Sequence, residues 1–340
     1  VVALGGEGGL SSRVAATGAR VVHLHMRPGV ASPLALWRLR RLMHDLQPHL
    51  IHGWMYHANV VAAVAAQATR FPVIWAIHHS LHALSGERPI TRLVIKAGAR
   101  MSARPAAVVY VARSSAMQHE QLGYRREKTR VIPNGFDSAQ FRPDAQQRQR
   151  LRAEWRVAPN TLAIGLVARL HPIKDHDNFL RAAALFALQC PDAVFILVGD
   201  GLEVTNAELA ERIATLGLTD RVRLCGRRND MTAVNAAFDV ASCSSWSESF
   251  PNAIGEAMAC GVVCAATDVG DIRDIIGDTG VVVPARNPEA LCDAWKQLAV
   301  LGEDGRRTLG ERARHRVIER YSLATVTEQY ETLYQQVIRG

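Results

Sequence analysis

Two glutamates eight positions apart, Glu248 and Glu256, are the residues whose type and spacing point most directly to chemistry. On one straight helix this spacing sets two side chains roughly 80° apart, so we expect Glu248 on a loop and Glu256 in the helix that follows it. Pro251 suits a first helical turn, whose free amides and partial positive charge favour a phosphate. Beside such a phosphate site, Glu248 would accept hydrogen bonds from sugar hydroxyls, and Glu256, further in, would bind a ribose diol. The alternative is a surface helix with two solvated carboxylates.

Two basic residues form a second candidate group. Arg169 and Lys174 follow the apolar run 162–167, and open α/β sheets bind ligands beyond the carboxyl ends of their strands. A planar guanidinium and a lysine ammonium both suit phosphate oxygens. Together they would stabilise negative charge on bound phosphate groups. The alternative is a pair of solvated side chains on a loop.

Histidines at two strand ends are candidates in the first part of the chain. His78 and His79 follow the apolar run 72–77, and His52 and His57 flank a second strand end. Imidazoles in such places are either hydrogen-bonded structure or polar groups that line a cleft. The residues alone leave both interpretations open.

Short apolar runs alternate with amphipathic stretches along the whole chain, which predicts parallel sheets covered by helices on both faces. The expected strands are residues 20–24, 49–52, 72–77, 107–112, 128–132, 162–167, 193–198, 221–225, 239–243, 262–266 and 280–283. The expected helices are residues 34–46, 57–69, 90–104, 113–122, 175–189, 204–216, 288–300, 303–320 and 322–338. The turn-rich segment 132–137 would link two domains.

Charge is distributed unevenly in a chain whose composition is that of an ordinary globular protein. Residues 1–133 hold 17 Lys and Arg against 5 Asp and Glu, a balance of +12, and the remainder holds 23 against 27, or −4. The asymmetry favours an anionic partner for the first part, such as a membrane surface or a phosphorylated acceptor. No recognised nucleic-acid motif accompanies it, so we expect no nucleic acid. Because we see neither a membrane-spanning run nor a signal peptide, we expect a cytoplasmic protein.

Several motifs, in order along the chain, resemble those of the retaining GT-B glycosyltransferases of group 1, family 4. The segment from Ser247 to Gly261 resembles the E-x7-E motif of that family. The other similar segments are the linker at 131–137, the diphosphate-binding turn at 165–174, the nucleotide-side loops at 198–201 and 224–227, and the loop at 265–271.

The resemblance implies two Rossmann-like domains that face each other across a cleft. We expect an N-terminal acceptor-side domain at 1–133, a nucleotide-sugar-binding domain at 134–320, and a C-terminal helix at 321–340 that packs back toward the first domain. The resemblance implies catalytic roles for Glu248, Arg169, Lys174 and His79. The residues expected to bind the donor are Glu256, Gly199, Asp200, Gly226, Arg227, Phe250, Pro251 and Asn252.

The implied reaction is retaining transfer of a hexosyl group from a UDP- or GDP-sugar to the hydroxyl of a glycan or lipid-linked acceptor, in bacterial polysaccharide or lipopolysaccharide synthesis. Front-face displacement is favoured, since no nucleophile stands near the expected sugar. An epimerase of the same architecture and a catalytically impaired nucleotide-sugar-binding protein are the alternatives.

A basic stripe suggests where such an enzyme would work. Arg92, Lys96, Arg100 and Arg104 recur every four residues, so that on a helix they form one gently drifting row. Such a row would hold the protein on the inner face of the cell membrane as a peripheral protein. The alternative is an ordinary solvated face.

We expect no metal or other cofactor, since the nucleotide sugar is a substrate. Asp175-His176-Asp177 matches the DxD pattern that binds a metal in the other major glycosyltransferase fold. Here it opens a helix directly after Lys174, where aspartate is ordinary capping chemistry. The six cysteines form no CxxC pair and no zinc-like set, so we expect free thiols.

The start of the chain departs from the family pattern. The cluster from Gly5 to Gly9 lacks the GxGxxG spacing of a phosphate-binding turn, and we interpret it as a plain turn. The chain begins at what resembles the second strand of the family, so its first strand and glycine-rich loop have no counterpart. Either the sequence is truncated or the first sheet is incomplete, and the second case would put catalytic competence in doubt.

Overall fold

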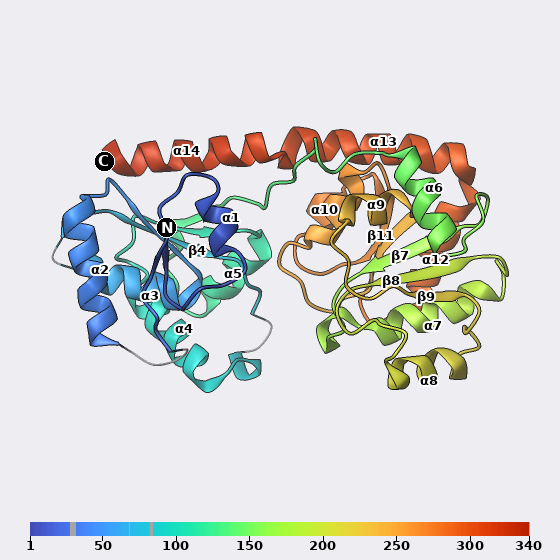
Figure 1. The fold of residues 1–340 in the computed structure, drawn as a ribbon, viewed down its shortest axis with the longest axis horizontal. Helices are drawn as coiled ribbons and strands as arrows, with labels where there is room; N and C mark the ends of the chain where they lie inside the picture. The colour runs from blue at the N-terminus through green and yellow to red at the C-terminus, as the bar shows by residue number, and fades with distance from the viewer. Residues whose placement is uncertain (28–31, 68, 82–83, 340) are drawn as a thin grey trace. The chain divides into compact units, whose positions relative to one another are not determined.

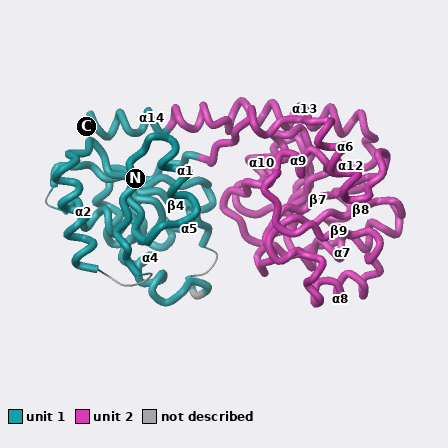
Figure 2. The backbone as a smooth tube through the Cα atoms, viewed as in Figure 1, with its two compact units in different colours: residues 1–132, 330–340 teal, residues 133–329 magenta. Residues whose placement is uncertain are grey.

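A computed structural model describes residues 1–27, 32–67, 69–81 and 84–339, which divide into two compact units (Figures 1 and 2). Unit 1 comprises residues 1–132 and 330–340, and unit 2 comprises residues 133–329. Each unit contains parallel strands that alternate along the chain with helices, which is the Rossmann-like arrangement that the apolar pattern predicts.

Unit 2 is built on a six-stranded parallel sheet with the strand order β12-β11-β10-β7-β8-β9. Its strands are β7 (Ala163–Val167), β8 (Val194–Val198), β9 (Val222–Leu224), β10 (Val240–Cys243), β11 (Val263–Thr267) and β12 (Gly280–Val283). The chain runs outward in one direction from β7 and in the other direction from β10. This reversal between two adjacent strands is the place where open sheets bind ligands, and it brings the loops after β7 and β10 together.

Helices cover this sheet and supply an aromatic core. They are α6 (Ala145–Glu154), the 3₁₀ turn η3 (Pro172–Lys174), α7 (His176–Ala187), α8 (Ala207–Thr215), α9 (Met231–Ala236), α10 (Asn252–Ala259), α11 (Ile272–Ile276), α12 (Pro288–Val300) and α13 (Gly302–Tyr321). Trp295 of α12 lies edge-on to Phe179 and Phe186 of α7, with ring centroids 5.1 and 5.9 Å away, and all three are fully buried. Edge-to-face packing of this kind stabilises the layer beyond its buried area.

Unit 1 contains a four-stranded parallel sheet with the order β3-β4-β5-β6 and a separate parallel pair, β1 and β2. The strands are β1 (Val2–Ala3), β2 (Val22–His23), β3 (Ile51–Trp54), β4 (Val73–Ile77), β5 (Ala107–Tyr110) and β6 (Thr129–Val131). The helices are α1 (Ser11–Ala15), α2 (Pro33–Leu46), α3 (Met55–Ala66), η1 (Leu84–Gly86), α4 (Pro89–Met101), α5 (Arg113–Gln121) and η2 (Arg126–Lys128). Every residue of β4 is buried, as expected for a central strand covered on both faces.

The last helix, α14 (Leu323–Arg339), begins in unit 2, and its residues from Tyr330 onward belong to unit 1. At its start, the linker residue Phe136 exchanges main-chain hydrogen bonds with Tyr321 and Leu323 at 2.7 and 3.0 Å. Phe136 also fits against Gly255 of α10, where a Cβ atom would lie 2.0 Å from its ring. The linker is therefore packed tightly against unit 2.

The predicted strands and most predicted helices are confirmed within a few residues. The helix expected at 90–104 ends earlier, because Arg104 precedes Pro105 and that position disfavours helical backbone. Arg104 therefore lies beyond α4, and three basic residues of the predicted stripe remain on the helix. Helix α6 was not predicted, since Leu151 is its one large apolar residue. The cluster from Gly5 to Gly9 lies in an irregular segment between β1 and α1.

All six cysteines are free thiols, as expected. None of the helices in the described ranges is both long enough and apolar enough to cross a membrane.

Candidate active site

A charged pair joins the loops after β7 and β10. Nζ of Lys174 lies 2.5 Å from Oε1 of Glu248, and Oγ of Ser245 donates a hydrogen bond to the same oxygen at 2.7 Å. The side chain of Lys174 is 22% exposed and that of Glu248 is 12% exposed. The pair is therefore partly shielded from water, which strengthens the attraction between the two charges.

Three hydrogen bonds hold η3 against the loop after β10. Oγ of Ser244 donates to the carbonyl of Lys174 at 2.8 Å. The main-chain N–H of Trp246 donates to the carbonyl of Ile173 at 2.9 Å, and its indole N–H donates to the carbonyl of Pro172, also at 2.9 Å. The segment that carries Lys174 is thus fixed in place by the segment that carries Glu248.

Arg169 is available for an anion. Its side chain is exposed, and its guanidinium has no ion-pair or hydrogen-bond partner within the described part of the chain. The backbone around it is held by the neighbouring loop, because the N–H of Ala168 donates to the carbonyl of Val198 at 3.0 Å and the N–H of Leu170 donates to the carbonyl of Asp200 at 2.7 Å. A rigid backbone with an uncommitted guanidinium suits a phosphate oxygen.

The loops after β8 and β9 form the scaffold beside this residue. Gly199 approaches so closely that a Cβ atom would lie 2.0 Å from the carbonyl oxygen of Ala168, so this position requires glycine. The N–H of Gly199 donates to the carbonyl of Gly226 at 2.9 Å. The side chains of Asp200 and Arg227 are exposed. Gly199 and Gly226 therefore shape the loops, and the exposed side chains of Asp200 and Arg227 can contact a ligand.

Glu256 lies within α10, and Glu248 lies on the loop before it, as the spacing predicts. Burial raises the pKa of the Glu256 carboxyl from 4.5 to about 7. Pro251 occupies the cap position of α10 and supplies no capping side chain. The N–H of Ile254 donates to the Pro251 carbonyl at 3.2 Å, whereas the amides of Asn252 and Ala253 have no acceptor among the described residues. The helix thus offers an anion-binding end and a carboxyl one turn further in.

Two of the expected donor-binding side chains are engaged within the protein. Phe250 is buried, with its ring stacked on Phe136 at 6.0 Å and lying edge-on to Tyr321 at 5.6 Å. Oδ1 of Asn252 accepts a hydrogen bond from Nδ2 of Asn134 at 2.8 Å. These side chains position the start of α10.

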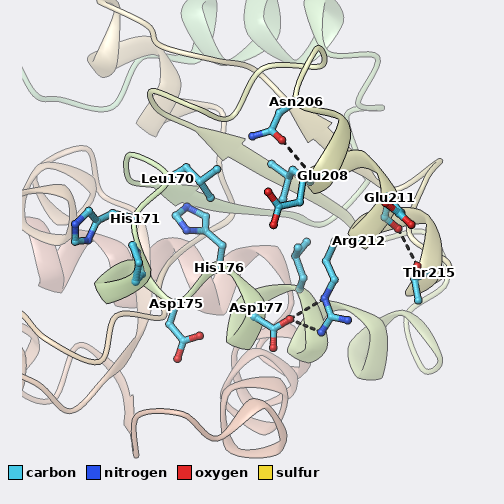
Figure 3. Close-up of a pocket in the computed structure, with 13 residues that line it drawn as sticks. Leu170, His171, Asp175, His176, Asp177, Asn206, Glu208, Glu211, Arg212 and Thr215 are labelled. Atoms are coloured by element: carbon cyan, nitrogen blue, oxygen red, sulfur yellow. Dashed lines mark hydrogen bonds and ion pairs between the residues drawn. The ribbon is translucent and has the colours of Figure 1, made fainter.

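A separate cavity of about 660 Å³ lies between α7 and α8 (Figure 3). Asp175, His176 and Asp177 line it, whereas Glu248 and Glu256 do not. Oδ1 of Asp175 caps α7 by accepting from the N–H of Asn178 at 3.2 Å, and Asp177 forms ion pairs with Arg181 and Arg212. Capping chemistry is therefore confirmed for Asp175, and across the described residues no three or more His, Cys, Asp or Glu side chains gather as metal ligands.

The expected histidines of unit 1 occupy different environments. His79 follows β4, with Nδ1 3.3 Å from the hydroxyl of Tyr56 and Nε2 3.5 Å from Oε1 of Glu87. His78 stacks on Trp54 at 4.8 Å, and Nδ1 of His52 is 2.8 Å from the hydroxyl of Tyr334. His79 thus lies beside a carboxylate, that of Glu87.

Sequence reasoning missed the partners of the expected site residues. Ser245 lies three positions before Glu248, inside a run of small polar residues after β10 that could have marked it as a site loop. Tyr56 and Glu87 contact His79 from elements 23 and 8 positions away. The contact with Tyr56 depends on β3 and β4 being neighbours in the sheet, so no local sequence pattern identifies it.

The chain is similar to known proteins along almost its full length. Residues 1–140 match the family model "Glycosyltransferase Family 4", and residues 161–300 match "Glycosyl transferases group 1". N-acetyl-alpha-D-glucosaminyl L-malate synthase of Bacillus anthracis is 28% identical over 294 residues, which cover 85% of this chain and 74% of that protein. D-inositol 3-phosphate glycosyltransferase of Salinispora tropica is 28% identical over 301 residues, which cover 80% of this chain and 61% of that protein.

The crystal structure of Anabaena HepE in complex with UDP and glucose superimposes with a TM-score of 0.84 and 25% identity, covering 98% of this chain and 91% of that one. Both halves of the chain thus match family models, and the whole fold matches a solved relative. The chain belongs to the glycosyltransferases of group 1, family 4, with the GT-B fold of two Rossmann-like units.

Proposed function

We propose that this protein transfers a glycosyl group from a UDP-sugar to an acceptor hydroxyl. The observation that carries the proposal is the meeting of Lys174, Glu248 and the start of α10 at the point where the sheet of unit 2 reverses direction. A UDP-sugar is preferred over a GDP-sugar because the similar HepE structure contains UDP and glucose.

Each residue has a role that follows from its charge and surroundings. Arg169, Lys174 and the open amides of α10 bind the diphosphate and stabilise the negative charge that grows as the sugar departs. Glu248 accepts hydrogen bonds from sugar hydroxyls, and Glu256 binds the ribose diol. In the absence of the sugar nucleotide, Glu248 neutralises Lys174. When the sugar nucleotide binds, the ammonium of Lys174 must also donate a hydrogen bond to a phosphate oxygen.

The reaction retains the configuration of the sugar by front-face displacement. No carboxylate other than Glu248 and Glu256 comes from the E-x7-E segment, and both are assigned to hydroxyl groups. The leaving diphosphate then accepts the proton of the attacking hydroxyl. Metal independence is part of the proposal, since Asp175 caps α7, Asp177 is ion-paired, and Arg169 and Lys174 supply positive charge.

The acceptor is the hydroxyl of a glycan or of a lipid-linked glycan in the synthesis of cell-surface polysaccharide. Helix α4 supports this setting, because Lys96 and Arg100 are exposed beside the exposed apolar residues Ile90 and Leu93. On α2, the guanidinium of Arg41 lies 5.7 Å from the ring of exposed Trp37. Basic and apolar groups side by side favour peripheral binding to an anionic membrane at the inner face of the cell.

The test is release of the nucleoside diphosphate, UDP from UDP-glucose, UDP-N-acetylglucosamine and UDP-galactose or GDP from GDP-mannose, with and without a panel of hydroxyl acceptors. We expect turnover with a UDP-sugar that depends on an acceptor and yields a glycoside of retained configuration. Asp177→Asn serves as the control, since its side chain lies in the separate cavity. Binding of UDP-sugars without any transfer, or epimerised donor as the sole product, would refute the proposed reaction.

A further inference from the structure

A chain of hydrogen bonds runs from the interior of unit 1 to His79. The hydroxyl of Tyr56 lies 2.8 Å from Nε2 of His119 and 3.3 Å from Nδ1 of His79. On the far side, Nδ1 of His119 lies 2.7 Å from the carbonyl oxygen of Ser115. Tyr56 and His119 are buried, whereas the side chain of His79 is 38% exposed.

The proton positions along this chain follow from its inner end. A carbonyl oxygen can only accept, so Nδ1 of His119 must carry a proton. Burial lowers the pKa of His119 to about 4, so the ring is neutral near pH 7 and Nε2 holds a lone pair. The Tyr56 hydroxyl must therefore donate its proton to Nε2 of His119.

The Tyr56 hydroxyl decides which nitrogen of His79 carries a proton. Burial raises the pKa of Tyr56 well above its usual range, so the phenol keeps its proton. That one proton is engaged by His119, and toward His79 the phenol oxygen can only accept. Nδ1 of His79 must carry a proton, and Nε2 is left as the nitrogen that faces Glu87.

We propose that Tyr56 and His119 are positioning residues that hold a proton on Nδ1 of His79, so that Nε2 is the nitrogen that meets a substrate hydroxyl. This inference rests on the proposed function and on the catalytic role that the family resemblance implies for His79. When His79 is neutral, Nε2 accepts a hydrogen bond from that hydroxyl. When His79 is protonated, Nε2–H points to Oε1 of Glu87 at 3.5 Å.

Helix α5 anchors both ends of the chain. Oγ of Ser115 donates to the main-chain carbonyl of His79 at 2.5 Å, and the carbonyl of Ser115 receives the His119 proton one turn later in the same helix. The groups that bear on the His79 ring are thus Tyr56 and Glu87 directly, and His119 through its hydrogen bond with Tyr56. The hydrogen bond made by one ring nitrogen of a histidine decides which of the two nitrogens carries the proton.

The test is the tautomer of His79, read from long-range ¹H–¹⁵N correlations in protein labelled with ¹⁵N-histidine. His79→Gln assigns the signal. We expect the Nδ1–H form in the natural protein and the Nε2–H form in Tyr56→Phe, where the acceptor is gone. His119→Leu should also give the Nε2–H form, since the Tyr56 proton then turns toward His79. This variant leaves Tyr56 and His79 unchanged and covers the case in which Tyr56→Phe does not fold.

The matched control is Tyr110→Phe, which removes a hydroxyl from a buried tyrosine whose ring lies 5.2 Å from that of His119. Within the described ranges that hydroxyl has no hydrogen-bond partner, so His79 should keep the Nδ1–H form. An Nε2–H form in the natural protein, or no change in both Tyr56→Phe and His119→Leu, would overturn the inference. The same tautomer change in Tyr110→Phe would also overturn it.

Kinetics separate this inference from the proposed function. Tyr56→Phe should lower kcat/KM with a UDP-sugar by roughly tenfold, the scale for losing one hydrogen bond to the substrate in the transition state. The Kd for UDP should not change, because the residues assigned to UDP lie in unit 2. Full activity in Tyr56→Phe would contradict the positioning role. A natural protein that holds the Nδ1–H tautomer yet transfers no sugar would instead contradict the proposed function.

Discussion

Lys174 and Glu248 form a direct ion pair, with Nζ 2.5 Å from Oε1, although they lie 74 positions apart and on different loops. Each is assigned to a different part of the donor, yet in the free protein they neutralise each other. Removing one therefore leaves the other as an uncompensated charge in a partly shielded site.

The first prediction concerns this pair. Lys174→Ala should weaken UDP binding by about 1.5–3 kcal/mol, the usual scale for hydrogen bonds to charged groups, because a cationic donor is lost and the remaining Glu248 carboxylate repels the diphosphate. Adding Glu248→Gln to Lys174→Ala should restore part of the affinity, as measured by calorimetry with UDP. Lys296→Ala, which removes a lysine paired at 2.9 Å with Asp293, is the control. If the changes in UDP affinity caused by Lys174→Ala and by Glu248→Gln alone simply add in the double variant, the ion pair has no influence on UDP binding.

The second prediction concerns Glu256 and pH. Its pKa is about 7 in the fold and 4.5 without burial, so stability falls as pH rises from about 4.5 to 7 and the carboxyl loses its proton inside the protein. Glu256→Gln should raise the free energy of unfolding at pH 8 on the order of 2–3 kcal/mol. It should change stability little at pH 4, where the carboxyl is protonated in both states, and it should weaken UDP binding at pH 8.

Thermal unfolding of the ligand-free protein at the two pH values measures this effect. The exposed Glu311→Gln is the control for loss of one negative charge. A Glu256→Gln variant that is less stable than the natural protein at pH 8 would show that the carboxylate is stabilised by the fold, against this prediction.

The third prediction concerns metal dependence. Transfer from the preferred UDP-sugar should survive EDTA, because Arg169 and Lys174 supply the positive charge at the diphosphate. Asp175→Asn should stay within about 0.5 kcal/mol of the natural stability, because asparagine caps helices as well as aspartate does, and it should keep its activity. A strict requirement for Mg²⁺ or Mn²⁺, together with weaker metal activation when Asp175 or Asp177 is changed, would contradict this assignment.

The fourth prediction concerns the membrane. Co-sedimentation with vesicles should need anionic lipid, fade with salt and fall in a variant with Arg92, Lys96 and Arg100 changed to Gln, since each basic residue near an anionic surface contributes about 1 kcal/mol. A matched variant changes Arg307, Arg312 and Arg320 of α13 to Gln and should bind as the natural protein does. Equal recovery with neutral and anionic vesicles would disprove peripheral binding through α4.

The sequence by itself determined most of the elements and identified the candidate site residues. Buried strands such as β4 are continuous apolar runs, and the positions of Glu248 and Glu256 relative to α10 follow from a proline and a spacing. These signals are local, because hydrophobic period and turn chemistry act over a few residues. From these local signals we placed the end of α4 too late. We did not predict α6, because it contains too few apolar residues to show a helical period.

Only the tertiary structure decided which side chains meet. The pairing of Lys174 with Glu248 requires β7 and β10 to be neighbours, although two strands separate them in the chain. The link from His119 through Tyr56 to His79 joins residues 63 and 23 positions apart and runs between elements of unit 1. Such contacts depend on strand order and helix packing, and for that reason no spacing along the sequence encodes them.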